Sequence, residues 1–308
     1  MMRTTDAVHL GLMLAALAIT YLVPFELLLL SYVVLGPAHY FTEISWLHDR
    51  KYFLPQRHVA FGLAGVAVLA ALIDNASWFG FVIWMAFVAC ALLTTTTAAQ
   101  SAVLTVVAVA VTAIMAANGS SLAVLGILLP TLIHVSLFTL VFMTLGAYRA
   151  GSKAQTLLVV IYLMAIGIIL VVPPSVATQI PAFAKAGQEY FGNVGPALGR
   201  LLGIANLRLD TRLTSLLAFV YTYHYLNWFI KADVIRWAEI PRWRLALVAV
   251  ASVASTALYF YNYAFGFTVL LALSLVHVVL EFPLNNLALR QLGAAIGQGF
   301  AQHLHRQA

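Results

Sequence analysis

The stretch PAHYFTEISWLHDR at Pro37–Arg50 decides how this chain folds, because it follows directly on the apolar run LLLLSYVV at Leu27–Val34. His39 and Glu43 stand four residues apart, so on a helix their side chains share one face. Ionisable groups inside a membrane are costly and mark substrate or ion sites. The stretch therefore predicts a membrane helix that carries a functional site.

The composition sets the class of protein. The 308 residues are 63% hydrophobic and 8% charged, whereas soluble proteins carry about 25% charged residues. Apolar runs of about 20 residues recur along the whole length, which predicts an all-α, polytopic integral membrane bundle with one transmembrane domain over residues 1–308. The only cysteine, Cys90, excludes a disulfide framework and a thiolate metal site. The formal charge of +6 comes from basic clusters between the apolar runs, which bear on orientation and not on nucleic acid.

We expect about ten transmembrane helices, or nine if the first is re-entrant or interfacial. Turn residues and prolines separate them. The expected spans are Val8–Val23, Glu26–Leu47, Val59–Ile73, Trp78–Leu93, Ser101–Ala117, Leu122–Leu145, Thr156–Val172, Leu213–Ile230, Leu245–Tyr261 and Phe267–Leu289.

The basic residues between the spans predict the orientation. Lys and Arg follow the second, sixth, eighth and tenth spans, and the turns after the first, third, fifth and ninth spans contain neither. The positive-inside rule then places both termini in the cytoplasm, in what we expect to be a bacterial inner membrane. The connection at 173–212 mixes apolar and cationic residues and predicts amphipathic segments on the extracytoplasmic face. It fits either a lid or a surface linker.

The His-x-x-x-Glu spacing returns near the other end of the chain, in VHVVLEFP, as His277 and Glu281. Two more histidines, His134 and His224, lie within other apolar spans. These four spans run in the same predicted direction, and at 1.5 Å per residue their histidines differ in depth by about 9 Å, which helix tilt absorbs. We therefore predict one metal site, with ligands drawn from His39, Glu43, His134, His224, His277 and Glu281.

Imidazole and carboxylate ligands suit Fe(II), Mn(II) or Zn(II), of which we favour Fe(II), and fit soft Cu(I) poorly. A mononuclear site would use three or four histidines, with the glutamates orienting the rings. A dinuclear site would use the glutamates as ligands. The alternative without metal is interhelical hydrogen bonding by each histidine.

The eighth span carries a polar stripe, with Tyr221, His224, Asn227 and Lys231 spaced along one helix face. Tyr221 and Asn227 are the catalytic candidates, since they could donate a hydrogen bond or bind a substrate oxygen, although both also suit ordinary interhelical hydrogen bonding. Lys231 lies near the inner end of this span, where we expect its side chain to snorkel to lipid phosphates. The aromatic residues beside the stripe, which include Tyr225 and Trp228, indicate interfacial anchors.

The segments GPAHYFTE and VHVVLEFP, together with one histidine on each of four spans, resemble the bacterial membrane β-carotene dioxygenases of the Brp/Blh type. That family's Pro-His-Gly run is absent here, and Glu stands in place of its Asp. The resemblance implies a helical membrane protein in which His39, His134, His224 and His277 hold iron and O₂ is used to cleave a carotenoid.

Three functions remain open. The first is an integral membrane, non-haem, iron-dependent oxygenase or oxidoreductase that takes O₂ and a lipophilic substrate (carotenoid-, isoprenoid- or lipid-like) from the surrounding membrane lipid. The second is a transporter of a divalent metal or a proton-coupled solute through the same His and Glu residues. The third is a haem-binding electron carrier. The substrate and the oligomeric state are not encoded in any motif that we recognise.

Overall fold

The computed structural model of the protein is helical throughout the part that it describes, and it contains no strand there. That part comprises residues 3–73, 75–117, 121–172, 211–231 and 236–307, with residues 174 and 196. Apart from its last residues and two single positions, the predicted amphipathic connection at 173–212 lies outside the described residues.

The helices follow the apolar runs of the sequence and end at the prolines, glycines and polar turns between them. They are α1 (Thr4–Leu22), α2 (Pro24–Leu30), α3 (Gly36–Asp49), α4 (Arg57–Ala71), α5 (Ala76–Leu93), α6 (Ala98–Ala117), α7 (Ser121–Leu128), α8 (Thr139–Ala150), α9 (Lys153–Val171), α12 (Thr211–Ile230), α14 (Arg242–Tyr261) and α15 (Tyr263–Gln307). Two π-helical stretches, η1 (Ser31–Leu35) and η3 (Leu129–Phe138), join α2 to α3 and α7 to α8.

Seven of the described helices are long and apolar enough to cross a membrane, which supports the prediction of a helical membrane bundle. They are Thr4–Leu22, Pro24–Asp49, Ala98–Ala117, Leu129–Ala150, Lys153–Val171, Arg242–Tyr261 and Tyr263–Gln298. Two shorter apolar helices, Arg57–Ala71 and Ser77–Leu93, and the more polar α12 occupy the other predicted spans. The count of ten spans and the side of the membrane on which the termini lie stay predictions.

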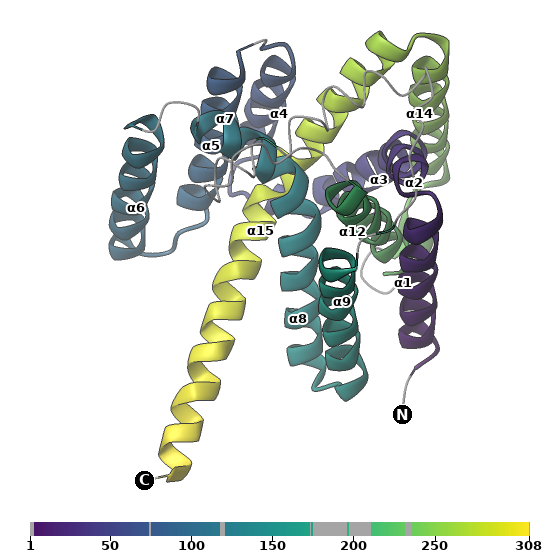
Figure 1. Ribbon diagram of the computed structural model, residues 1–308. Helices are drawn as coiled ribbons and strands as arrows, with labels where there is room; N and C mark the ends of the chain where they lie inside the picture. Colours follow the sequence, from purple (N-terminus) through teal and green to yellow (C-terminus); the bar gives the residue numbers. More distant parts are fainter. Residues whose placement is uncertain are drawn as a thin grey trace.

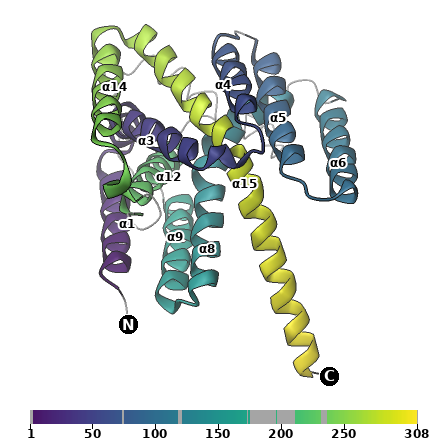
Figure 2. The same cartoon turned by 180° about the vertical axis from the view of Figure 1, so that it is seen from behind.

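The bundle is built around α12 and the first part of α15 (Figures 1 and 2). Every side chain from Leu213 to Tyr225 is buried, because α1, α2, α3, α9 and η3 all pack on α12. The α4–α5 and α8–α9 hairpins surround this centre, and α14 packs against α15. The first residues of α1 and the last residues of α15 lie at the same end of the molecule.

The π-helical η1 lies just before Pro37, which has no backbone N–H to donate to the Val33 carbonyl four residues earlier. Thr256 on α14 donates its hydroxyl to that carbonyl at 2.9 Å. A neighbouring helix therefore satisfies the backbone group that the proline frees, as backbone in lipid requires. The interruption lies four residues before His39, so it bears on the rotation of α3 that gives this side chain its direction.

Pro283 lies inside the continuous helix α15, and the carbonyl that it leaves without a backbone donor belongs to Val279. The buried Cys90 thiol on α5 points at that carbonyl, with 3.9 Å between sulfur and oxygen. The cysteine thus has a structural partner beside Glu281. The helix continues past Leu289, the predicted end of this span, to Gln307, and its last turns extend beyond the bundle (Figure 1).

Candidate metal centre

Four helical segments bring the four predicted histidines to one place inside the bundle. All four side chains are buried, with at most 8% of any of them exposed. They are His39 on α3, His134 in η3, His224 on α12 and His277 on α15. The convergence predicted from their spacing and depth is therefore present.

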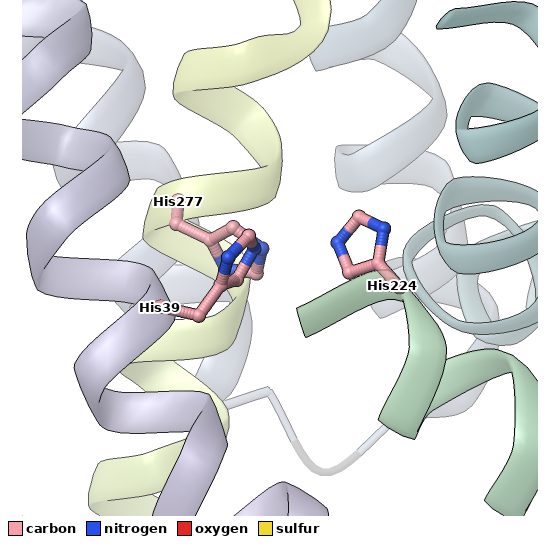
Figure 3. A group of neighbouring side chains, drawn as sticks. All are labelled: His39, His224 and His277. Atoms are coloured by element: carbon pink, nitrogen blue, oxygen red, sulfur yellow. The ribbon is translucent and has the colours of Figure 1, made fainter. Parts of the chain in front are cut away.

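The four imidazoles form a closed ring of neighbours. The centroid of His39 lies 4.9 Å from that of His224 and 5.2 Å from that of His277. His134 lies opposite, 5.1 Å from His224 and 5.2 Å from His277. Figure 3 shows His224 facing His39 and His277 across a gap. One ring nitrogen from each of these three lies within 4.8 Å of the others.

The ring nitrogens have few partners on neighbouring helices. Among the described residues, seven of the eight make no hydrogen bond that meets full geometric criteria. Of these seven, His39 Nε2 and His134 Nε2 lie beside carboxylates, and the His277 ring interacts with backbone groups of its own helix. The eighth, His224 Nδ1, lies 2.7 Å from the Thr139 hydroxyl. Buried polar atoms are normally satisfied, and leaving one unsatisfied costs about 1–3 kcal/mol. The nitrogens are thus available to an ion that enters the gap.

The contacts of the Thr139 hydroxyl favour one tautomer of His224. The hydroxyl donates to the Val135 carbonyl at 2.9 Å. A hydroxyl has one hydrogen, so the lone pairs of Thr139 then accept from Nδ1–H of His224. Nε2 of His224 is left deprotonated, which is the form that binds a metal.

The two glutamates stand beside two different histidines. Glu43 Oε2 is 3.0 Å from His39 Nε2, as the spacing on α3 predicts. Glu281 Oε2 is 3.4 Å from His134 Nε2. Glu281 therefore pairs with a histidine on another helical segment, and not with His277, which lies one turn before it on α15. The carboxyl groups of Glu43 and Glu281 also lie close enough to interact with each other. The six predicted residues therefore form one cluster with two His–Glu pairs.

Aromatic side chains surround the cluster, and two of them, Tyr225 and Trp228, were predicted as interfacial anchors. Tyr40 stacks on His277 at 4.2 Å, and its hydroxyl lies 2.7 Å from that of Tyr225. Tyr225 and Trp228 pack on His39 with centroids at 4.9 and 5.6 Å. Their positions in the sequence, directly after a histidine or one turn along the helix, are the signal that could have identified them. No comparable signal in the sequence identifies Thr139, because its contact with His224 joins two different helices.

A cavity of about 330 Å³ adjoins the cluster and is lined by His39, His224, Glu43 and Glu281. This volume is within the range of small-molecule sites. Asn227 lines it as well, and Lys231, expected at lipid phosphates, also faces it. The other catalytic candidate, Tyr221, is not among the lining residues, and its ring packs on Tyr32 and Tyr225.

Taken together, these features define an all-helical membrane protein with a buried His/Glu cluster beside a cavity. No protein-family model matches the chain, and neither a curated protein nor a solved structure is significantly similar to it. The resemblance to the β-carotene dioxygenases therefore stays a prediction, and the function must be argued from the cluster itself.

Proposed function

We propose that the protein is an integral membrane, non-haem metalloenzyme, an iron-dependent oxygenase or related oxidoreductase that acts on a lipophilic substrate. The observation that carries the proposal is the closed ring of four buried imidazoles with two carboxylates beside them, in which few ring nitrogens bond to carbonyls or hydroxyls of neighbouring helices. Interhelical hydrogen bonding, the alternative without metal, would pair these nitrogens with carbonyls or hydroxyls on neighbouring helices. Only His224 has such a partner among the described residues.

The donor set fits a divalent ion of intermediate softness. Imidazole nitrogens and carboxylate oxygens bind Fe(II), Mn(II) and Zn(II). The nitrogen atoms of His39, His224 and His277 span up to 4.8 Å, wider than the roughly 3.4 Å between ligands of a tetrahedral ion bound at about 2.1 Å. Small rotations of the rings into the gap would close this difference, so we expect the cluster to contract on binding.

The chain's own residues have separable roles in this proposal. Thr139 holds His224 with Nε2 free, and the glutamates either bind the ion or accept hydrogen bonds from the N–H groups of the rings beside them. Tyr40, Tyr225 and Trp228 exclude water from the cluster, which strengthens electrostatic interactions inside it. Bound iron would supply open coordination positions for O₂ and for the substrate.

Transport is the second candidate, because the segments that carry His39 and His134 are interrupted. η1 lies four residues before His39, and His134 lies within η3. Irregular turns of this kind are frequent at functional sites, and broken helices form the binding sites of many transporters. In that case the same six residues would bind a divalent ion only transiently.

Elemental analysis of protein purified in mild detergent without chelators tests the proposal. We expect about one or two equivalents of iron, held strongly enough to survive purification, and no Soret band, which would indicate haem. His39→Ala and His277→Ala should lose the metal. The matched control is His48→Ala, on the same helix as His39 but exposed, and it should keep the metal. If the unmodified protein retains no metal, a metalloenzyme is excluded, and flux of divalent ions into proteoliposomes becomes the test of transport.

A further inference from the structure

A line of polar side chains connects the histidine cluster with one end of the bundle. Asn227 follows His224 on the same face of α12, Lys231 comes directly after the last residue of that helix, and Gln291 follows Glu281 on α15. All three line the cavity that begins at the cluster. From His224 to Lys231 the helix rises by about 10 Å, so Lys231 marks a second level of the cavity, away from the proposed metal.

Two cations meet at this second level. Lys231 and Arg149 both line the cavity at the cluster, and both also line a second cavity of about 340 Å³ that adjoins it. Neither has a carboxylate within ion-pair distance among the described residues. The Arg149 guanidinium donates to the Gln291 amide oxygen at 2.6 Å, and the Lys231 ammonium lies 5.7 Å from the centroid of Phe142. Both contacts are to neutral groups.

The charges of the two levels are unequal. If Glu43 and Glu281 are ionised, they balance the charge of a divalent ion at the cluster, a step that rests on the proposed function. Lys231, which interacts electrostatically with both glutamates, is then left without a counter-charge of its own, whereas Arg149 is exposed and is balanced by solvent. A charge that is partly withdrawn from water needs a counter-charge, and oxyanions are the groups that ammonium and guanidinium bind through charge-assisted hydrogen bonds.

Apolar side chains occupy the space between the two levels. Phe142 and Leu145 line the cavity from α8, and Leu284 and Leu287 line it from α15. An extended hydrocarbon fits between these walls, with one end at the cations and its body directed at the histidines.

We propose that the substrate is an amphiphile with a terminal oxyanion, a carboxylate or a phosphate, which Lys231 and Arg149 bind so that its hydrocarbon part reaches the His/Glu cluster. Asn227, between the two levels, contacts the chain near its head. A neutral hydrocarbon such as a carotene would bring no anionic group to Lys231 and Arg149. The anionic head group therefore narrows the proposed substrate from any lipophilic molecule to an anionic amphiphile.

Tryptophan fluorescence offers a direct test, because Trp46 and Trp228 line the cavity. We would add 9,10-dibromostearic acid to the protein in zwitterionic nanodiscs, since bromine quenches tryptophan on contact. The methyl ester of the acid serves as the neutral probe, a bromoalkyl phosphate as the second oxyanion, and inorganic phosphate as the competitor that lacks a chain. We expect saturable quenching by the two anionic amphiphiles, and only non-saturable quenching by the ester as it partitions into the bilayer. If inorganic phosphate displaces the acid as effectively as the bromoalkyl phosphate does, the hydrocarbon chain adds nothing to binding. The site would then be one for the free ion, and the proposal of an amphiphilic substrate would be wrong.

The variants locate the site. Lys231→Met should weaken binding of the acid at least tenfold, and Lys231→Arg should retain most of it. Lys153→Met is the matched control, because Lys153 is exposed, begins α9 directly after α8, and does not line either cavity. Equal affinity for acid and ester, or an unchanged affinity in Lys231→Met, would overturn the inference. Arg149→Gln provides the same test if Lys231→Met does not fold.

Metal content measured on the same samples separates this inference from the proposed function. Charge-selective binding by a protein that holds no metal would refute the metalloenzyme and leave the oxyanion site standing. Bound metal without charge-selective binding would refute only the oxyanion site.

Discussion

Replacing Thr139 by Val should weaken metal binding although the new side chain has nearly the same shape. The hydroxyl of Thr139 lies 2.7 Å from His224 Nδ1, and without it Nδ1–H loses its acceptor. An unsatisfied buried donor costs about 1–3 kcal/mol, and the loss of an outer partner typically lowers metal affinity by about 10–100-fold. We expect a loss of this size, because His224 can then take the tautomer whose proton sits on the nitrogen that faces the gap.

The assay is competition for the metal with a chromophoric chelator, on protein reconstituted from the metal-free form. Thr144→Val is the matched control. Thr144 lies on the same helix as Thr139, and its hydroxyl donates to the Leu140 carbonyl one turn earlier at 2.7 Å, so it makes the same kind of backbone contact away from the histidines. Thr139→Ser keeps the hydroxyl and should retain the affinity. If Thr139→Val and Thr144→Val bind the metal equally well, the tautomer argument is wrong.

Two further predictions concern the interrupted helix and the second His–Glu pair. Thr256→Val removes the donor to the Val33 carbonyl and should destabilise the bundle by about 0.6–1.7 kcal/mol in reversible unfolding from detergent. In a Pro37→Ala background a backbone N–H is restored, so the loss of stability caused by Thr256→Val should be smaller. An equal loss in both backgrounds would contradict the account of the interruption. Glu281→Gln should reduce metal retention, because the neutral amide beside His134 neither binds the ion as a carboxylate does nor balances its charge. The variant should elute from size-exclusion chromatography as the unmodified chain does, which shows that it is folded. Unchanged metal retention would assign Glu281 to packing.

The sequence alone determined which residues could meet, because membrane helices follow simple rules. Lipid requires long apolar runs, and helical periodicity puts His39 and Glu43 on one face. The cost of an ionisable group in lipid made the four buried histidines the candidates. Each of these arguments concerns one helix and its solvent, so it needs no knowledge of the neighbouring helices.

Only the tertiary structure decided the partners across helices. Glu281 lies beside His134 and not beside His277, Tyr221 is turned away from the cavity, and Lys231 faces into it. These contacts depend on how each helix is rotated and how far it is shifted along its neighbours. Lipid is as apolar as the side chains that pack between helices, so an apolar run does not show which of its faces is buried. Rotation and register are set instead by local features such as the Pro37 interruption and its Thr256 donor, whose partners are over 200 residues apart in the chain. The sequence determined the members of the cluster, and packing determined their pairing, because helical periodicity acts within one segment and interhelical contacts do not.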